Sequence, residues 1–170
     1  EKKSGKGTTV LSDRLFNKLS KAASFSNMIE EEGHHLTKEI IAIEKIKVDP
    51  AEVEIAAAFG DEAYKLTRFY RLDREPYIHF EHYLPVLGDE ASLAEIGQVS
   101  LYKWLANYQK LVGKFKDSFA VAPAEPAIQK LLKTDSPYLL KRIRTSYSQE
   151  DEIIEISHAM YDTNKYPYMI

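Results

Sequence analysis

The sequence predicts an α+β fold in which an antiparallel sheet is flanked by helices. Strand-like segments outnumber helical ones, and most neighbouring strands are joined by short turns, which make hairpins rather than the long crossovers of parallel sheets. A chain of 170 residues is most simply one domain with a sizeable core. Its 44% hydrophobic and 29% charged residues are ordinary for a globular protein.

A hairpin over residues 64–84 is the clearest element. Residues 64–72 are mostly β-branched, aromatic or long and apolar, and Asp73-Arg74-Glu75 supplies turn chemistry. Pro76 lies where a strand can begin without donating a ladder hydrogen bond, and Pro85 ends the second strand.

Alternation gives this hairpin two faces. Arg68 and Tyr70 share one face of the first strand, and His79, Glu81 and Tyr83 share one face of the second. Two interpretations are open. Arg68 and Glu81 form a cross-strand ion pair on a solvated face, which the spacing alone favours. Alternatively, Arg68 binds an anion, because its planar fork suits a phosphate or carboxylate.

The other elements follow from caps and periodicity. Ser24 or Ser26 caps a short helix that ends at Gly33, and its N-terminal amides could bind an anion. The remaining predicted strands are residues 36–48, 113–123, 138–148 and 153–161, and the remaining helices are 50–59 after Asp49, 92–96, a longer one capped by Ser100, and 126–133.

Composition and motifs exclude several classes of function. A net charge of −3 gives no global attraction to DNA or anionic membranes, and no apolar run reaches membrane-spanning length. Without cysteine there is no disulfide or thiolate site, which suits a reducing cytosol. The five histidines lack metal-site spacing, and the G-x-S-x-G, G-x-G-x-x-G and Walker patterns are absent. We therefore expect no metal and no cofactor. Paired carboxylate catalysis remains open through Glu81 and Glu155.

Six short motifs occur in a fixed order along the chain. They are Ser4-Gly5-Lys6-Gly7-Thr8-Thr9-Val10, Ser24-Phe25-Ser26, Arg68 with Pro76, Glu81 before Tyr83-Leu84-Pro85, Ser100-Leu101-Tyr102, and Ile154-Glu155 with Tyr161. In this order and spacing the whole chain resembles the effector-binding UTRA domain of GntR-type bacterial transcription regulators of the HutC subfamily. The opening motif is similar to the last strand of their winged helix-turn-helix.

The resemblance implies a chorismate-lyase-like fold without lyase activity, in a cytoplasmic homodimer with no membrane partner. It implies that residues 1–11 are a remnant of the wing, 12–23 a linker and 24–170 the UTRA domain. Because the chain begins at Glu1 rather than Met, we expect it to be part of a longer protein. A small-molecule effector would weaken operator binding by the missing N-terminal domain of this repressor.

The most similar members of the family sense phosphorylated sugars such as hexosamine 6-phosphates. By that similarity Phe25 and Ser26 donate to the phosphate, Arg68 clamps it and Ser100 completes the nest. Side chains expected to meet the hydroxyls or amine of the sugar are Glu81, Tyr102, Glu155 and Tyr161. The chain departs from the family at Tyr70 and His158, where arginines are usual. A phosphorylated sugar–amine adduct or a carboxylate is therefore also open.

Two other classes of function remain as alternatives. One is an enzyme of the same fold that acts on a small anionic substrate, against which the absence of a recognisable nucleophile or acid–base pair counts. The other is a domain that only dimerises. Thermal stabilisation by a metabolite without chemical change indicates a sensor, product formation indicates an enzyme, and no response indicates the third class.

Overall fold

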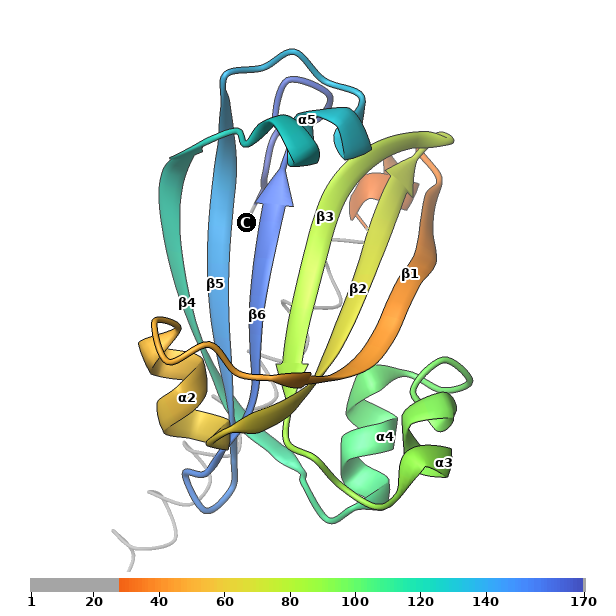
Figure 1. The fold of residues 1–170 in the computed structure, drawn as a ribbon. Helices are drawn as coiled ribbons and strands as arrows, with labels where there is room; N and C mark the ends of the chain where they lie inside the picture. Colours follow the sequence, from red (N-terminus) through yellow and green to blue (C-terminus); the bar gives the residue numbers. More distant parts are fainter. Residues whose placement is uncertain (1–27, 170) are drawn as a thin grey trace, which may run out of the picture.

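The strand-forming segments assemble into one six-stranded antiparallel sheet, in the order β1-β2-β3-β6-β5-β4 (Figure 1). The computed structural model describes residues 28–169. The strands are β1 Leu36–Lys47, β2 Glu62–Leu72, β3 Glu75–Leu84, β4 Val112–Pro123, β5 Tyr138–Ser148 and β6 Ile153–Tyr161. The predicted α+β class with a helix-flanked antiparallel sheet is confirmed.

Short helices join the strands, and side-chain caps fix where two of them begin. They are α2 Val53–Phe59, α3 Glu90–Glu95, α4 Leu101–Asn107 and α5 Pro126–Leu132, and residues 28–31 are also helical. Ser100 caps α4 as predicted. α3 begins before Ser92 because the Asp89 side chain accepts hydrogen bonds from the Ala91 and Ser92 amides. α2 begins only at Val53, because Asp49 instead closes a turn onto the Ala51 amide.

The turn between β2 and β3 forms where the sequence predicts it. Asp73 and Arg74 both adopt positive φ, at 48° and 75°, which is the pattern of the tight hairpin turn favoured by strand twist. The Asp73 carboxylate accepts hydrogen bonds from the His35 amide at 2.7 Å and the His34 ring at 2.5 Å. These bonds fix the turn to the segment that follows helical residues 28–31.

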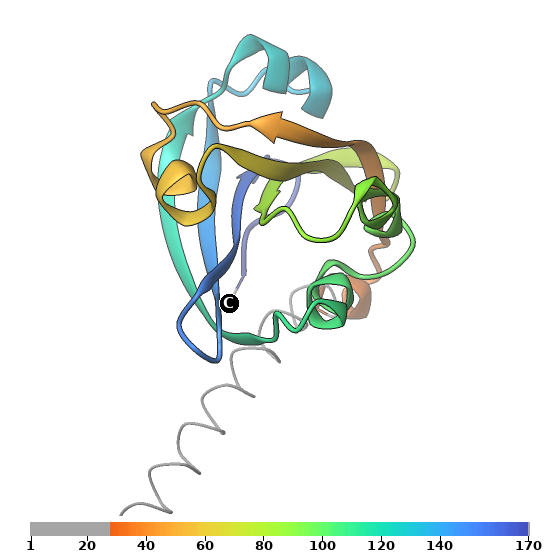
Figure 2. The ribbon, with the colours of Figure 1, turned by 60° about the horizontal axis from the view of Figure 1, so that its bottom comes forward.

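Register defines the two faces of the sheet. We call the face that carries Arg68, Phe80 and His82 the inner face, and the face that carries Phe69, Glu81 and Tyr83 the outer face. α2 packs on the outer face through Ile55 against Tyr83, and α5 packs there through its buried Leu132 against Phe69. In Figure 2 the sheet is curved, with α4 and the C-terminal segment inside the curve.

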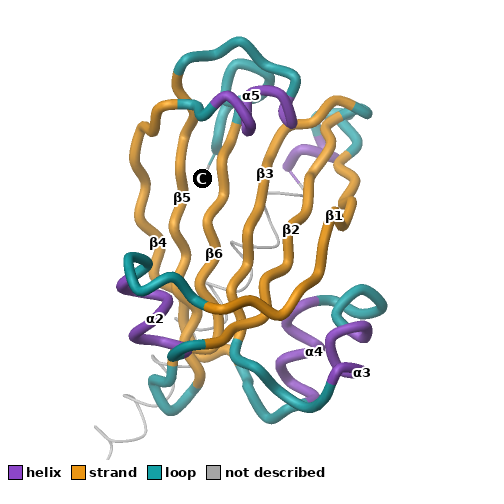
Figure 3. Tube along the Cα trace, in the orientation of Figure 1, coloured by secondary structure: helices purple, strands orange, loops and turns teal. Residues whose placement is uncertain are grey.

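Two apolar clusters cover the ends of the inner face. At one end, Ile29 from the helical residues 28–31 and Tyr166 from the C-terminal segment pack with Phe80 and Tyr161. At the other end, α3 and α4 pack on the sheet, with Trp104 fully buried. Figure 3 shows the described helices gathered near the two ends of the strands. The middle of the inner face, between the two apolar clusters, carries polar and charged side chains.

Candidate functional site

Polar and charged side chains occupy the inner face between the two apolar clusters. Register places Arg68 of β2, Phe80 of β3, Ala159 of β6 and Arg142 of β5 in one row across the sheet. The next row holds Leu66, His82, Ser157 and Arg144. The two β6 residues in these rows are small, so larger polar side chains from both sides converge over the middle of the sheet. We call Arg68, His82, Arg142, Arg144 and Glu155 the inner-face polar cluster.

A chain of hydrogen bonds holds the Arg68 guanidinium in place. Its Nε donates to Nε2 of His82 over 3.0 Å, and Nδ1 of His82 lies 2.7 Å from Oε1 of Glu155. The hydroxyl of Ser146 donates to the other oxygen of Glu155 over 2.6 Å. Because Nε2 of His82 accepts, Nδ1 carries the proton and donates to Glu155. These hydrogen bonds orient Arg68 through its Nε and leave its two terminal nitrogens for another acceptor.

Burial and hydrogen bonding set the charge states of His82 and Glu155. Burial lowers the pKa of His82 to about 4, despite the opposing hydrogen bond with Glu155, and nearby Arg68 and Arg142 lower it further. Burial disfavours a charged Glu155, but the hydrogen bonds from His82 and Ser146 outweigh it and lower the pKa of Glu155. At neutral pH the pair is thus a neutral imidazole and a carboxylate.

The two arginines of β5, Arg142 and Arg144, differ in their hydrogen bonding. Arg144 forms a bidentate pair with Asp117, with both N–O distances at 2.7 Å. The guanidinium carbon of Arg142 instead lies 5.7 Å from the ring centroids of both Phe80 and Tyr161. Its Nε is buried, and no residue accepts its hydrogen bond in the described part of the chain.

The structure brings five of the predicted site residues to this region. Arg68 and Glu155 are members of the cluster, and Tyr161 lies beside Arg142. The guanidinium carbon of Arg68 lies 5.3 Å from the ring centroid of Tyr70. Tyr102 reaches the same face from α4, where burial and then the neighbouring Glu155 raise its pKa.

Glu81 and His158 lie on the outer face, directly opposite each other in register. Oε2 of Glu81 accepts the hydroxyl of Tyr83 at 2.9 Å and lies 3.5 Å from Nζ of Lys65. The predicted Arg68–Glu81 ion pair is wrong, because Arg68 pairs with Phe80 and faces the other way. The sheet separates both residues from the inner-face polar cluster, so grouping them with Arg68 in one site is corrected.

Three predicted site residues remain, namely Phe25, Ser26 and Ser100. Phe25 and Ser26 lie outside the described residues. The hydroxyl of Ser100 accepts the Lys103 amide at 3.3 Å, which is a helix cap. Sequence reasoning also missed His82, Arg142 and Arg144. Alternation puts His82 on the opposite face of its strand from Glu81, and only the register between β2 and β3 shows that this face also carries Arg68.

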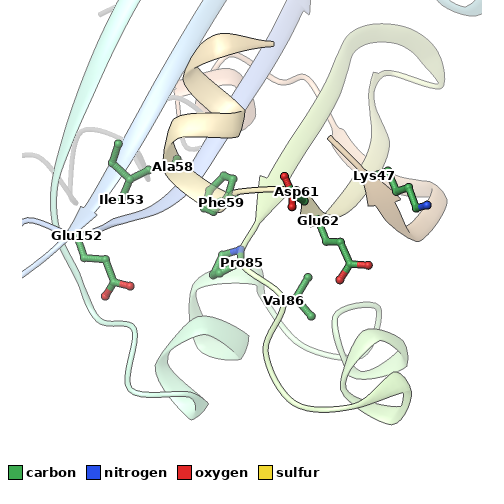
Figure 4. Close-up of a pocket in the computed structure, with 9 residues that line it drawn as sticks. All are labelled: Lys47, Ala58, Phe59, Asp61, Glu62, Pro85, Val86, Glu152 and Ile153. Atoms are coloured by element: carbon green, nitrogen blue, oxygen red, sulfur yellow. The ribbon is translucent and has the colours of Figure 1, made fainter. Parts of the chain in front are cut away.

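A separate hollow of about 690 Å³ lies beside α2, at the end of the strands (Figure 4). It is lined by Lys47, Ala58, Phe59, Asp61, Glu62, Pro85, Val86, Glu152 and Ile153. Two of its carboxylates already form ion pairs, Glu62 with Lys45 at 2.9 Å and Glu152 with Lys110 at 2.7 Å. Three of the lining residues are acidic and one is basic, so the inner-face polar cluster is the better candidate for an anionic ligand.

Two further features concern only residues 28–169. No three histidine, aspartate or glutamate side chains gather there as a set of metal ligands. No helix in this range combines the length and apolar character needed to cross a bilayer.

The fold is a helix-flanked antiparallel sheet, and comparison with known proteins gives the family. The UTRA domain model matches residues 31–167, so the chain belongs to the UTRA domain family. Its fold is that of the effector domains of GntR-family transcriptional regulators, as the following solved structures illustrate. No protein of curated function matches the chain in sequence.

One similar structure is the ligand-binding domain of a GntR-family regulator from Bordetella bronchiseptica, with a TM-score of 0.64 and 19% identity over 76% of this chain and 84% of that one. PhnF from Mycobacterium smegmatis gives a TM-score of 0.65 and 17% identity, over 81% of this chain but only 62% of PhnF. The effector domain of PhnF alone gives 0.66 and 17%, over 83% of this chain and 89% of the domain.

Proposed function

We propose that this chain is the effector-sensing part of a GntR-family repressor of the HutC subfamily, and that it binds a small anionic metabolite at Arg68. The observation that carries the proposal is the Arg68 guanidinium, which His82 orients through Nε on a half-buried face. An arginine fixed by one nitrogen presents its terminal nitrogens as a preformed fork for phosphate or carboxylate.

The neighbouring groups favour a ligand that has hydroxyls or an amine besides its anionic group. Glu155 is a buried carboxylate that can accept hydrogen bonds, and the rings of Tyr70 and Tyr161 flank the cluster. A phosphorylated sugar or a phosphorylated sugar–amine adduct combines these features. The anionic part would meet Arg68, and the polar part would meet Glu155 and Tyr102.

The effector would act on DNA binding through the N-terminal DNA-binding domain of such a regulator. In this proposal the regulator is a cytoplasmic homodimer, and effector binding weakens its hold on operator DNA. The chain itself carries a net charge of −3, which gives it no electrostatic attraction to DNA of its own. The alternative is an enzyme of the same fold, for which the oriented Arg68 and the buried His82–Glu155 pair would hold a small anionic substrate.

A ligand panel tests the proposal. Thermal unfolding of the chain is followed with sugar phosphates, amino-sugar phosphates, carboxylates and the matching neutral sugars, and each mixture is then analysed by mass spectrometry. We expect an upward shift with phosphorylated compounds only, and their recovery unchanged. Arg68→Ala should weaken the best ligand by about 1.5–3 kcal/mol, the scale of a hydrogen bond to a charged group. Conversion to product would favour the enzyme, and no shift by any anion would overturn both functions.

A further inference from the structure

Arg142 has a buried donor without an acceptor. Its Nε is the one buried side-chain nitrogen or oxygen in residues 28–169 that lacks a hydrogen-bond partner. Buried polar groups in folded proteins are nearly always paired, because an unpaired donor loses its bond to water without replacement. The guanidinium is held by the faces of Phe80 and Tyr161 rather than by a carboxylate. The surroundings of Arg142 therefore lack one hydrogen-bond acceptor for its Nε.

The unpaired Nε of Arg142 lies near Arg68, the residue proposed to bind the effector. Arg142 and Arg68 belong to the same row of the sheet, separated by Phe80 and Ala159. Each guanidinium carbon lies 5.7 Å from the centroid of the Phe80 ring, so the two lie within twice that distance of each other. Ala159 projects only a methyl group between them.

Neither of these two arginines is neutralised by a carboxylate in the described part of the chain. The ion pairs there include Arg144 with Asp117 but neither Arg68 nor Arg142. Glu155, the carboxylate at the end of the hydrogen-bond chain, accepts from His82 and Ser146 and forms no ion pair with an arginine of residues 28–169. Two cations on one face, neither paired directly with a carboxylate, attract a ligand group of double negative charge more strongly than a single one does.

We propose that Arg142 is the second arm of the effector site, and that Arg68 and Arg142 together select a doubly charged anionic group. This inference rests on the proposed function and adds to it a residue from β5. It also accounts for Tyr70, which stands where a second arginine was expected on β2. The second positive charge comes from across the sheet instead.

Sulfate, which carries two negative charges, and nitrate, which carries one, serve as probe anions without a sugar. Their dissociation constants are measured by calorimetry at constant ionic strength for the wild type, Arg68→Gln, Arg142→Gln and the control Arg74→Gln. Arg74 is an exposed arginine of the β2–β3 turn, so its replacement removes the same charge elsewhere. We expect each cluster variant to weaken sulfate binding roughly 10- to 100-fold, as for loss of a charge-assisted hydrogen bond. The control should bind as the wild type does.

The ratio of sulfate affinity to nitrate affinity is a second measurement. The wild type should prefer sulfate to nitrate, and Arg142→Gln should remove most of that preference. A purely structural Arg142 predicts a different result, in which the variant changes stability but leaves the sulfate-to-nitrate ratio unchanged. That result would overturn the inference, while continued loss of sulfate binding in Arg68→Gln would leave the proposed function standing. If the wild type binds neither sulfate nor any phosphorylated compound, the proposed function fails first.

Arg142→Met keeps the test decisive if the glutamine variant folds poorly. Methionine retains an unbranched apolar stem against Phe80 and Tyr161 but removes the unpaired donor. We expect the ligand-free Met variant to melt at or above the wild-type temperature and to bind sulfate at least tenfold more weakly. A Met variant that melts lower and binds sulfate normally would show that Arg142 serves packing alone.

Discussion

His82 and Glu155 form a hydrogen-bonded pair that is shielded almost completely from solvent, with 2.7 Å between Nδ1 and Oε1. Neither residue could be buried alone at low cost, since a lone carboxylate or imidazole would lose its hydration. Together they form a fixed acceptor on the inner face, and Nε2 of His82 presents its lone pair to Arg68. The position of the proposed ligand-binding arginine therefore depends on the charge state of a histidine behind it.

The first prediction concerns stability at low pH. The pKa of His82 is lowered to about 4 in the folded protein, against an ordinary value of 6.5. Below pH 6.5 the unfolded chain takes up a proton that the folded chain does not, so the free energy of unfolding falls until the pH reaches the folded pKa. The loss from this one residue is about 3 kcal/mol between pH 6.5 and 4.

Urea unfolding at several values of pH measures this loss. His82→Gln keeps a side chain that can donate and accept but cannot titrate, so its stability should fall less steeply over the same range. His79 and His158, whose pKa values burial also lowers, remain in both proteins and cancel in the comparison. Equal slopes for the two proteins would mean that His82 is not held neutral by the fold.

The second prediction concerns Glu155. Glu155→Gln replaces an oxygen by an amide nitrogen, which cannot accept, so one of the donors from His82 and Ser146 is left unpaired. We expect the free energy of unfolding to drop by about 1–3 kcal/mol. Glu150→Gln removes the same charge from the exposed β5–β6 turn and should change it by less than about 0.5 kcal/mol. Chemical denaturation of both variants at pH 7 makes the comparison.

The third prediction separates capping from ligand binding at Ser100. Its hydroxyl caps α4, so Ser100→Ala should cost about 1 kcal/mol of stability and leave anion binding unchanged. Ser100→Asp retains a capping oxygen and should restore the stability. If Ser100 also contacted a bound phosphate, the aspartate would repel it, and calorimetry with sulfate would show weaker binding than in the alanine variant.

Alternation and caps predicted the strands and their hairpins, because these depend on residues close in sequence. The grouping of residues into one site was harder, because it depends on register. A bulge beside Tyr70 and Arg71 shifts the pairing of β2 with β3 by one residue, so Arg68 pairs with Phe80 of the inner face rather than with His79 of the outer face. Arg142 reaches the same row from a strand much later in the chain. No local pattern marks it, and its unpaired donor is visible only in three dimensions.

The fourth prediction follows from the two faces of the sheet. Glu81 matches a family motif but lies on the outer face with Tyr83 and Lys65, so Glu81→Gln should leave sulfate binding unchanged. Its stability cost should stay below about 1 kcal/mol, because the carboxylate and its lysine partner are both partly exposed. His158→Gln, which changes the residue opposite Glu81, should behave in the same way. Weaker sulfate binding in either variant, measured beside Arg68→Gln, would show that residues of the outer face take part in binding and that the site is not confined to the inner-face polar cluster.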